Sequence, residues 1–441
     1  MQPVQMLQEL IRARTVNPPG DEKLAAEIIA AELRAGGLEV QSLESPEGRV
    51  SVVGRLPGPK DLPALVLLSH TDVVPVEEDL WTHDPFGGDI DSGFIWGRGA
   101  LDMKSIAVMH IAAAIALARS EDSPSREVIV VAVADEEAGG EHGARWLLEQ
   151  HPDLVGLEEG RPPPEVIGEG GYGISDVIDR PVIPIVLGEK TAVWLRLIAH
   201  GEPGHGALPP DRQAPANLAR ALGQVSGYRN VRLHPVLRKQ FAELARVSTG
   251  GRGAFFRLLA SPAGNKALGL MRSKLGWLGA IGAAMADTVT PTQLEAGYKH
   301  NVVPATASAA LDCRLLPNTD PESFVRDLIR RVEKLDIEVE MPKTYTSGPV
   351  SDPGPLFRIL EEVSRSLDGH AVIVPSLTPA ITDIRFFRSR GATGYGWVPL
   401  VLDRELLATI HGHDERIPID GFEHAVGAMT EAVRRAATAG G

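Results

Sequence analysis

The first third of the chain alternates short apolar runs with longer helical patterns. Continuous apolar runs, which are typical of buried strands, cover residues 64–70 and 127–134. Apolar residues at helical spacing predict helices over residues 24–37, 103–120 and 141–151. This alternation predicts an α/β fold in which a mostly parallel central sheet is flanked by helices. In such a sheet, ligands collect at the carboxyl ends of the strands.

The order of the predicted elements changes between residues 190 and 345. The patterns there indicate, in order, a strand, a helix, two strands, a helix and a strand, over 191–201, 214–227, 290–297, 306–317, 321–335 and 336–341. This βαββαβ order suggests an inserted two-layer domain with an antiparallel sheet, with extra helices inside it at about 228–287. We therefore expect a discontinuous first domain, formed by 1–189 and 346–441, around an inserted domain at 190–345.

The size and charge of the chain limit what it can be. Its 441 residues exceed the length at which a single hydrophobic core stops growing, so two domains are expected. The formal net charge of −14, from 44 Lys and Arg against 58 Asp and Glu, opposes binding to nucleic acid and to anionic membranes. The single cysteine, Cys313, cannot form an internal disulfide. Because no signal peptide or bilayer span is predicted either, the expectation is a cytoplasmic protein without a nucleic-acid or membrane partner.

Polar residues with metal-binding chemistry follow the first apolar run. His70 and Asp72 lie two residues apart in "HTD", so their side chains are expected on the same side of the strand. One of them can bind a metal while the other orients the imidazole. Asp102 follows a glycine-rich turn and precedes a predicted helix, so it is a further candidate ligand or, alternatively, a helix N-cap.

Two adjacent glutamates, Glu136 and Glu137, follow the second apolar run. Two carboxylates side by side repel each other, and burial would raise the pKa of at least one of them unless cations compensate. Glu169 follows another apolar run, and His411 and His413 lie near the end of the chain. Histidines and carboxylates without thiolates form a nitrogen and oxygen ligand set that suits Zn²⁺ or a similar cation.

Seven motifs occur in a fixed order along almost the whole chain: "SHTDVVPV", "WTHDPFGG", "WGRGALDMK", "ADEEAGG", "GHGALP", "NVVPA" and "HGHDERI". With them the chain resembles the dinuclear zinc peptidase and amidohydrolase family, which includes aminoacylases, carboxypeptidases of the G and S types and succinyl-diaminopimelate desuccinylase. The resemblance implies a catalytic domain interrupted by a lid and dimerisation domain.

The resemblance implies two Zn²⁺ per subunit, with Co²⁺ or Mn²⁺ as alternatives. His70 and Glu169 would bind one ion, Glu137 and His411 would bind the other, and Asp102 would bridge them.

The resemblance also gives a role to the remaining acidic residues. Asp72 would brace His70, and Glu136 would be the general base that takes a proton from the metal-bridging water and later gives it to the leaving amine. The paired glutamates are then compatible because two dications lie beside them.

Four more residues match substrate-handling positions of the family. His205 would reach the active site of the partner subunit in a homodimer, although a glycine-flanked surface histidine without a task is the alternative. Asn301 and Arg314 would help to hold the substrate, while an arginine on a sheet can instead pair with a carboxylate. Arg385 would take the free carboxylate of the substrate, but "TPAITD" replaces the glycines that usually precede this position.

The resemblance, together with these residues, implies a metal-dependent hydrolase that cleaves an amide bond next to a free carboxylate. The substrate would be a dipeptide, a short peptide or an N-acyl amino acid. A biosynthetic deacylase, such as a desuccinylase or an acetylornithine-type deacetylase, is the first alternative. A catalytically inactive relative that only binds peptides is the second.

Overall fold

The computed structural model describes residues 1–271 and 279–439, which form two compact units. The first unit contains residues 1–188 and 348–376 and the chain from Thr382 onward. The second unit contains residues 189–347 and the short segment 377–381. The sequence placed that short segment in the first domain, together with Glu189 and residues 346–347, which also belong to the second unit.

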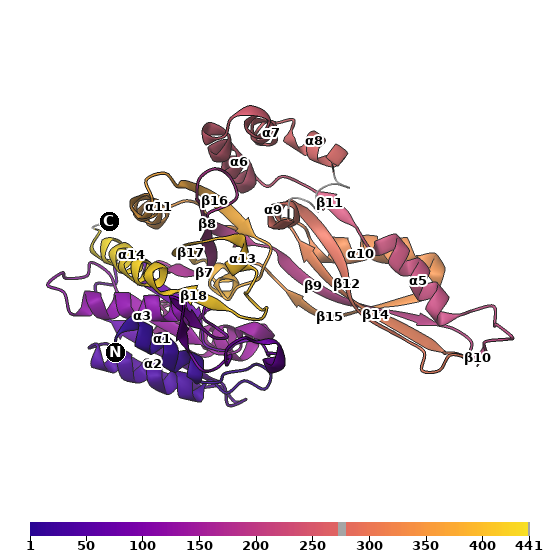
Figure 1. The fold of residues 1–441 in the computed structure, drawn as a ribbon, viewed down its shortest axis with the longest axis horizontal. Helices are drawn as coiled ribbons and strands as arrows, with labels where there is room; N and C mark the ends of the chain where they lie inside the picture. The colour runs from indigo at the N-terminus through magenta and orange to yellow at the C-terminus, as the bar shows by residue number, and fades with distance from the viewer. Residues whose placement is uncertain (272–278, 440–441) are drawn as a thin grey trace. The chain divides into compact units, whose positions relative to one another are not determined.

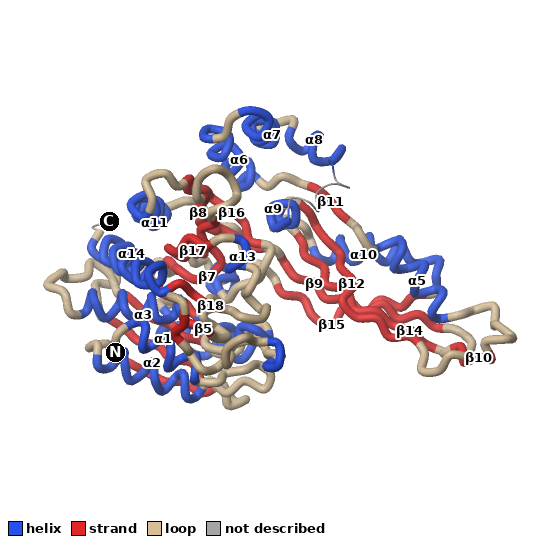
Figure 2. Tube along the Cα trace, in the orientation of Figure 1, coloured by secondary structure: helices blue, strands red, loops and turns tan. Residues whose placement is uncertain are grey.

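An eight-stranded sheet runs through the first unit (Figure 2). Its strands are β1 (Glu39–Glu44), β2 (Val50–Leu56), β3 (Leu65–His70), β6 (Val128–Val133), β7 (Glu165–Ile174), β8 (Val182–Glu189), β16 (Val372–Thr378) and β17 (Thr393–Leu402). They lie in the order β1-β2-β6-β3-β7-β17-β8-β16. The central strands β6, β3, β7 and β17 are parallel. β1 pairs antiparallel with β2, β2 with β6, and β8 with β17. The predicted α/β fold with a mostly parallel central sheet is therefore confirmed.

Helices cover both faces of this sheet (Figure 1). One layer consists of mutually packed helices, α1 (Pro3–Arg12), α2 (Lys23–Ala35), α3 (Lys104–Ala118), α11 (Pro355–Leu367) and α14 (Ile419–Thr438). On the other face a π-helical turn (Glu141–Arg145), α4 (Trp146–Gln150) and α12 (Ile384–Ser389) bury apolar side chains against β3, β6 and β7. Because β3 and β6 are buried at every residue, their sequences are continuous apolar runs.

Short elements complete the first unit. They are the 3₁₀ turns Glu78–Leu80, Glu136–Ala138 and Pro152–Val155, the helix α13 (Arg404–Leu407), and a small sheet of β4 (Ile90–Asp91), β5 (Phe94–Trp96) and β18 (Arg416–Pro418). None of the described helices is long and apolar enough to cross a membrane.

The second unit contains a five-stranded antiparallel sheet in the order β11-β12-β14-β9-β15. Its strands are β9 (Thr191–His200), β11 (Arg229–Val231), β12 (Ala286–Ala296), β14 (Thr306–Leu315) and β15 (Ile337–Tyr345). Helices α5 (Ala214–Val225) and α10 (Pro321–Val332) pack on each other and on the same face of this sheet (Figure 1). A short ribbon pairs β10 (Gly204–His205) with β13 (Val302–Val303).

Additional helices follow β11 in the predicted insertion at about 228–287. They are α6 (Pro235–Val247), α7 (Gly250–Ala260), α8 (Gly264–Met271) and α9 (Gly279–Ala284). Residues 272–278 of this predicted insertion lie outside the described residues.

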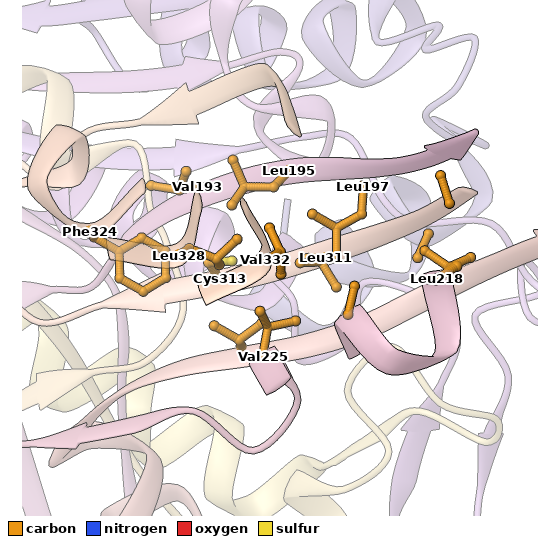
Figure 3. Packing of buried hydrophobic residues seen from close by; sticks show 14 of the residues in the cluster. Val193, Leu195, Leu197, Leu218, Val225, Leu311, Cys313, Phe324, Leu328 and Val332 are labelled. Atoms are coloured by element: carbon orange, nitrogen blue, oxygen red, sulfur yellow. The ribbon is translucent and has the colours of Figure 1, made fainter. Parts of the chain in front are cut away.

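The core of the second unit forms between its sheet and its two covering helices (Figure 3). Alternate residues of β9, namely Val193, Leu195 and Leu197, are buried in this core, whereas Trp194 between them is 40% exposed on the opposite face. Cys313 of β14 lies in the same core, where burial raises the pKa of its thiol to about 12. The period-two pattern of β9 therefore reflects a sheet with one covered face.

Glu169 lies within β7, beside the point where the register of β17 shifts. The sequence placed Glu169 at the end of an apolar run, and the buried residues 166–168 directly precede it, although β7 itself continues to Ile174. The parallel pairing of β7 with β3 stops at Ile167, opposite Leu67, so Glu169 still projects beyond it towards the end of β3. Beside Glu169 the register of β17 shifts at Gly396, where a Cβ atom would lie 2.2 Å from the Glu169 carbonyl oxygen.

Gly396→Ala is expected to lower the free energy of unfolding of the first unit by about 1–3 kcal/mol, because the added methyl group would push against the backbone of β7. Gly223→Ala in α5 is the matched control, since no described atom lies within 4 Å of that Cβ position and alanine favours helix by about 0.5–1 kcal/mol. Chemical denaturation measures both effects. Equal stabilities of Gly396→Ala and wild type would contradict this account of β7.

Candidate metal centre

His70 ends β3 and directs one ring nitrogen at carboxylates. Its Nε2 atom lies 3.2 Å from Asp102 Oδ1 and 3.7 Å from Glu169 Oε2. Its Nδ1 atom lies 3.0 Å from the backbone oxygen of Asp72, which can only accept a hydrogen bond. Nδ1 must therefore carry the proton when the imidazole is neutral, which leaves the Nε2 lone pair free to bind a cation.

Asp102 stands between the two histidines. Its Oδ1 atom faces His70, and its Oδ2 atom lies 3.2 Å from Nε2 of His411. His411 Nε2 is also 3.3 Å from Glu137 Oε1. Two ligand groups result, one of His70, Asp102 and Glu169 and one of Asp102, Glu137 and His411, with ligand atoms within 4.8 Å of one another in each. Asp102 belongs to both groups, as a bridging ligand would.

Glu136 lies beside these groups without belonging to either of those found among the described residues. Its Oε2 atom is 4.0 Å from His70 Nε2, and its side chain is only 10% exposed. Asp135, with φ 70°, turns the chain out of β6, and a 3₁₀ turn begins at Glu136. The two adjacent glutamates therefore differ in role. Glu137 is a candidate metal ligand, whereas Glu136 belongs to neither ligand group.

Asp72 holds the backbone of both glutamates. Its carboxylate accepts hydrogen bonds from the backbone N–H of Glu136 at 3.2 Å and of Glu137 at 3.1 Å. The distance from its Oδ1 atom to His70 Nδ1 is 3.6 Å, longer than that from its backbone oxygen. The closest brace of His70 is therefore the carbonyl of Asp72, while its carboxylate positions the Glu136–Glu137 segment.

Two residues that the sequence analysis did not single out form hydrogen bonds with Asp72 and with its neighbour Asp135. Asn17 donates from Nδ2 to Asp72 at 2.8 Å and to Asp135 at 3.3 Å. Arg49 donates to Asp135 at 2.7 Å and forms a buried ion pair with Glu22. Asn17 and Arg49 lie in the first 50 residues and away from any predicted strand end, so no local pattern identifies them.

The electrostatics of the site favour bound cations. Burial raises the pKa of Glu169 to about 8 and raises the pKa values of Glu136 and Glu137 above their ordinary range. The hydrogen bond to Asp102, followed by that to Glu137, raises the pKa of His411 to about 10. Glu137 Oε1 is buried and lies 3.3 Å from His411 Nε2. This excess of buried negative charge, with nitrogen and oxygen donors only, fits a pair of divalent cations.

Arg385 lies in the first unit but is only 1% exposed. Its guanidinium group donates to the backbone oxygens of Gly139 at 2.7 Å and Thr382 at 3.1 Å, and it lies over the ring of Phe386. Nearby, both carboxylate oxygens of Asp383 are buried without a hydrogen-bond partner among the described residues, and burial raises its pKa to about 7. This placement of Arg385 does not favour capture of a carboxylate from solvent.

The other predicted substrate residues lie in the second unit. His205 of β10 is exposed, and its Nδ1 atom accepts a hydrogen bond from the backbone N–H of Ala207 at 3.1 Å. The same ribbon brings Asn301 close, because its backbone oxygen accepts from the backbone N–H of Gly206 at 2.9 Å. Arg314 pairs with Asp312 on β14 at 2.8 Å, which is the alternative noted for it in the sequence. The substrate roles of these residues stay predictions.

Two ligand groups that share a carboxylate, at the carboxyl edge of an α/β sheet, define the class of metal-dependent hydrolases with a paired metal site. The model of Peptidase family M20/M25/M40 matches residues 66–435, and the chain belongs to this family.

Individual relatives agree with this assignment. Aminoacylase-1 of Mus musculus is 28% identical over 436 residues, which are 97% of this chain and 93% of the relative. The M20 family metallo-carboxypeptidase of Sulfolobus solfataricus has a TM-score of 0.74 at 18% identity, covering 98% of this chain and 99% of the other. A dinuclear metal-binding M20 peptidase of Bacillus subtilis has a TM-score of 0.60 at 14% identity, covering 99% and 98%. The predicted family is confirmed, and the protein is a hydrolase of the metallopeptidase and aminoacylase class.

Metal removal is expected to destabilise the protein more as the pH rises. Without metal, Glu169 and His411 have pKa values raised to about 8 and about 10, against ordinary values of 4.5 and 6.5. A raised pKa contributes stability below the unfolded value, and this stability is lost as the pH rises through the folded value. Metal binding requires the deprotonated ligands, so it strengthens over the same range.

The difference in melting temperature between metal-loaded and chelator-treated protein should therefore widen from about pH 6 to about pH 9. With free Zn²⁺ at about 100 times its Kd, the added stability is about 2.7 kcal/mol. Thermal unfolding at each pH, with and without chelator, measures the difference. A difference that stays constant with pH would contradict the placement of these ligands.

Proposed function

We propose that this protein hydrolyses the amide bond of an N-acyl amino acid, a dipeptide or a short peptide with a free carboxylate, using two zinc ions. The observation that carries the proposal is the pair of ligand groups that share Asp102 beside Glu136, a buried carboxylate that belongs to neither group. Bound cations would lower the pKa of a water molecule and polarise the carbonyl of the substrate. Co²⁺ or Mn²⁺ could bind to the same donors.

Glu136 is the group placed to move protons. It takes a proton from the attacking water as the new carbon–oxygen bond forms. It then gives that proton to the amide nitrogen as the carbon–nitrogen bond breaks, which yields a carboxylic acid and an amine, and proton transfer between these products leaves a carboxylate and an ammonium group. The backbone of Glu136 is held by Asp72, so its carboxylate stays beside His70 rather than turning to solvent.

The nature of the substrate is proposed from the relatives. Mouse aminoacylase-1 points to N-acyl amino acids, and the Sulfolobus enzyme is named a carboxypeptidase. Both names describe cleavage of an amide bond near a carboxylate. A biosynthetic deacylase of the desuccinylase or acetylornithine type remains the alternative enzyme. A peptide-binding relative without activity is less favoured, because Glu136 and every predicted ligand are brought together.

Replacing Glu136 by Gln should lower kcat by about 10²- to 10⁴-fold on the best substrate, because the amide cannot accept the proton of water. Amine release would be followed on N-acetyl amino acids, dipeptides and N-succinyl-diaminopimelate, with zinc and after chelation. Glu141→Gln is the matched control, since Glu141 lies in the same segment but pairs with Arg145 at the surface.

Metal-dependent turnover that survives Glu136→Gln would overturn the role of Glu136. Turnover that is unaffected by chelation would overturn the metal centre. Preference for N-succinyl-diaminopimelate over N-acetyl amino acids and dipeptides would replace the proposed substrate by that of the alternative deacylase.

We further propose that the protein is a homodimer in which His205 contacts the scissile carbonyl in the partner subunit. The exposed position of His205 on a short ribbon supports this, because its ring is available to another molecule. A location in the cytoplasm, predicted from the single cysteine, stays a prediction as well.

His205→Ala should lower kcat by about tenfold or more with little change in metal content, because one donor to the developing oxyanion is lost. His200→Ala is the control, since His200 is an exposed histidine of the same unit that pairs with Glu338. Steady-state kinetics and the mass in solution would be measured together. A fully active His205→Ala variant, or an active monomer, would contradict the proposal that His205 acts in the partner subunit.

A further inference from the structure

The peptide group that leads into Asp102 is held from both sides. The hydroxyl of Tyr172 donates to the backbone oxygen of Leu101 at 2.5 Å. Glu415 Oε1 accepts from the backbone N–H of Leu101 at 2.7 Å and from that of Asp102 at 3.0 Å. The backbone that carries the shared carboxylate therefore has fixed partners on its carbonyl side and on its amide side.

Glu415 is itself completely buried and fully supplied with donors. Its Oε2 atom accepts from Arg98 Nη1 at 2.7 Å and from the backbone N–H of Gly99 at 3.1 Å. Arg98, which is 2% exposed, also donates to the backbone oxygen of Gly412 at 2.9 Å. A buried carboxylate with an arginine and three backbone donors is a rigid anchor, because loss of any partner would leave a charge unpaired.

The two anchors belong to the same segments as the outer ligands. Tyr172 follows Glu169 by three residues on β7, and Glu415 follows His411 by four residues in the loop before β18. Glu169 and His411 are the ligands that pair with Asp102 in separate groups. Each anchor thus ties the shared ligand to the segment of one outer ligand.

We propose that Tyr172 and Glu415 are positioning residues that set the Asp102 carboxylate between the two metal positions, so that loss of either anchor weakens metal binding at both. The reason is that Asp102 offers one oxygen to each group, and a shift of its backbone moves both oxygens together. This inference rests on the proposed function only in requiring a site that binds two cations.

Two residues of the first unit provide matched controls. Tyr395, which is buried, is a tyrosine whose hydroxyl likewise donates to a backbone oxygen, that of Asp352 at 2.6 Å. Glu127 is also a buried glutamate that pairs with arginines, here Arg55 and Arg161. Neither Tyr395 nor Glu127 has a hydrogen bond or ion pair with the candidate ligands among the contacts found in the described residues.

The experiment is a titration of the full-length, metal-free protein with Zn²⁺ alone, repeated with Co²⁺ alone, by calorimetry and by competition with a chelator. Tyr172→Phe and Glu415→Gln should each bind the metal about 10- to 100-fold more weakly at both positions. Tyr395→Phe and Glu127→Gln should bind as the wild type does. Melting temperatures of the metal-free proteins would show whether a variant is folded, and Tyr172→Phe alone carries the test if Glu415→Gln is not.

Wild-type affinities in folded Tyr172→Phe would overturn the inference, and so would an equal loss of affinity in Tyr395→Phe. Because no substrate is used, these outcomes leave the proposed amide hydrolysis untouched. Failure of the wild type to bind two metal ions would instead overturn the proposed function and this inference together.

Discussion

Crowding of acidic side chains around His70 is the constraint on which the rest of the first unit depends. Asp102, Glu136, Glu137 and Glu169 converge there, and burial raises the pKa values of the three glutamates. Such a cluster is stable at neutral pH only with protons or cations inside it. Two cations between the ligand groups would allow three carboxylates to remain ionised as ligands and would leave Glu136 to exchange protons.

Hydrogen bonds to backbone amides and buried ion pairs hold the segments that carry this cluster. Asp72 accepts from the amides of Glu136 and Glu137, and Glu415 accepts from those of Leu101 and Asp102. In both places a buried carboxylate accepts hydrogen bonds from the backbone of a segment that carries a candidate ligand. A backbone segment held in this way fixes the starting point of each ligand side chain, which is what a preorganised metal site requires.

Much of the site could be predicted because each strand end carries its own signal. The apolar runs of β3 and β6 stop at His70 and just before Glu136, and parallel strands bring such ends to one edge. The structure adds what the sequence-based prediction could not contain at positions where segments distant in the chain are in contact. β7 continues beyond Glu169, beside which the register of β17 shifts at Gly396, and the guanidinium group of Arg385 is occupied by backbone oxygens that come from two separate segments.

The sequence by itself determined the α/β class, the family and the identity of the candidate ligands, because apolar period and motif order are local properties of the chain. Only the tertiary structure decided which carboxylate oxygen of Asp102 faces which histidine and that the Asp72 carboxylate binds the backbone of the two glutamates. It also decided that Asn17, Arg49, Tyr172 and Glu415 hold the segments that carry the ligands. These relations join residues between about 30 and 310 positions apart along the chain. Such pairings depend on strand register and loop path, which no local pattern records.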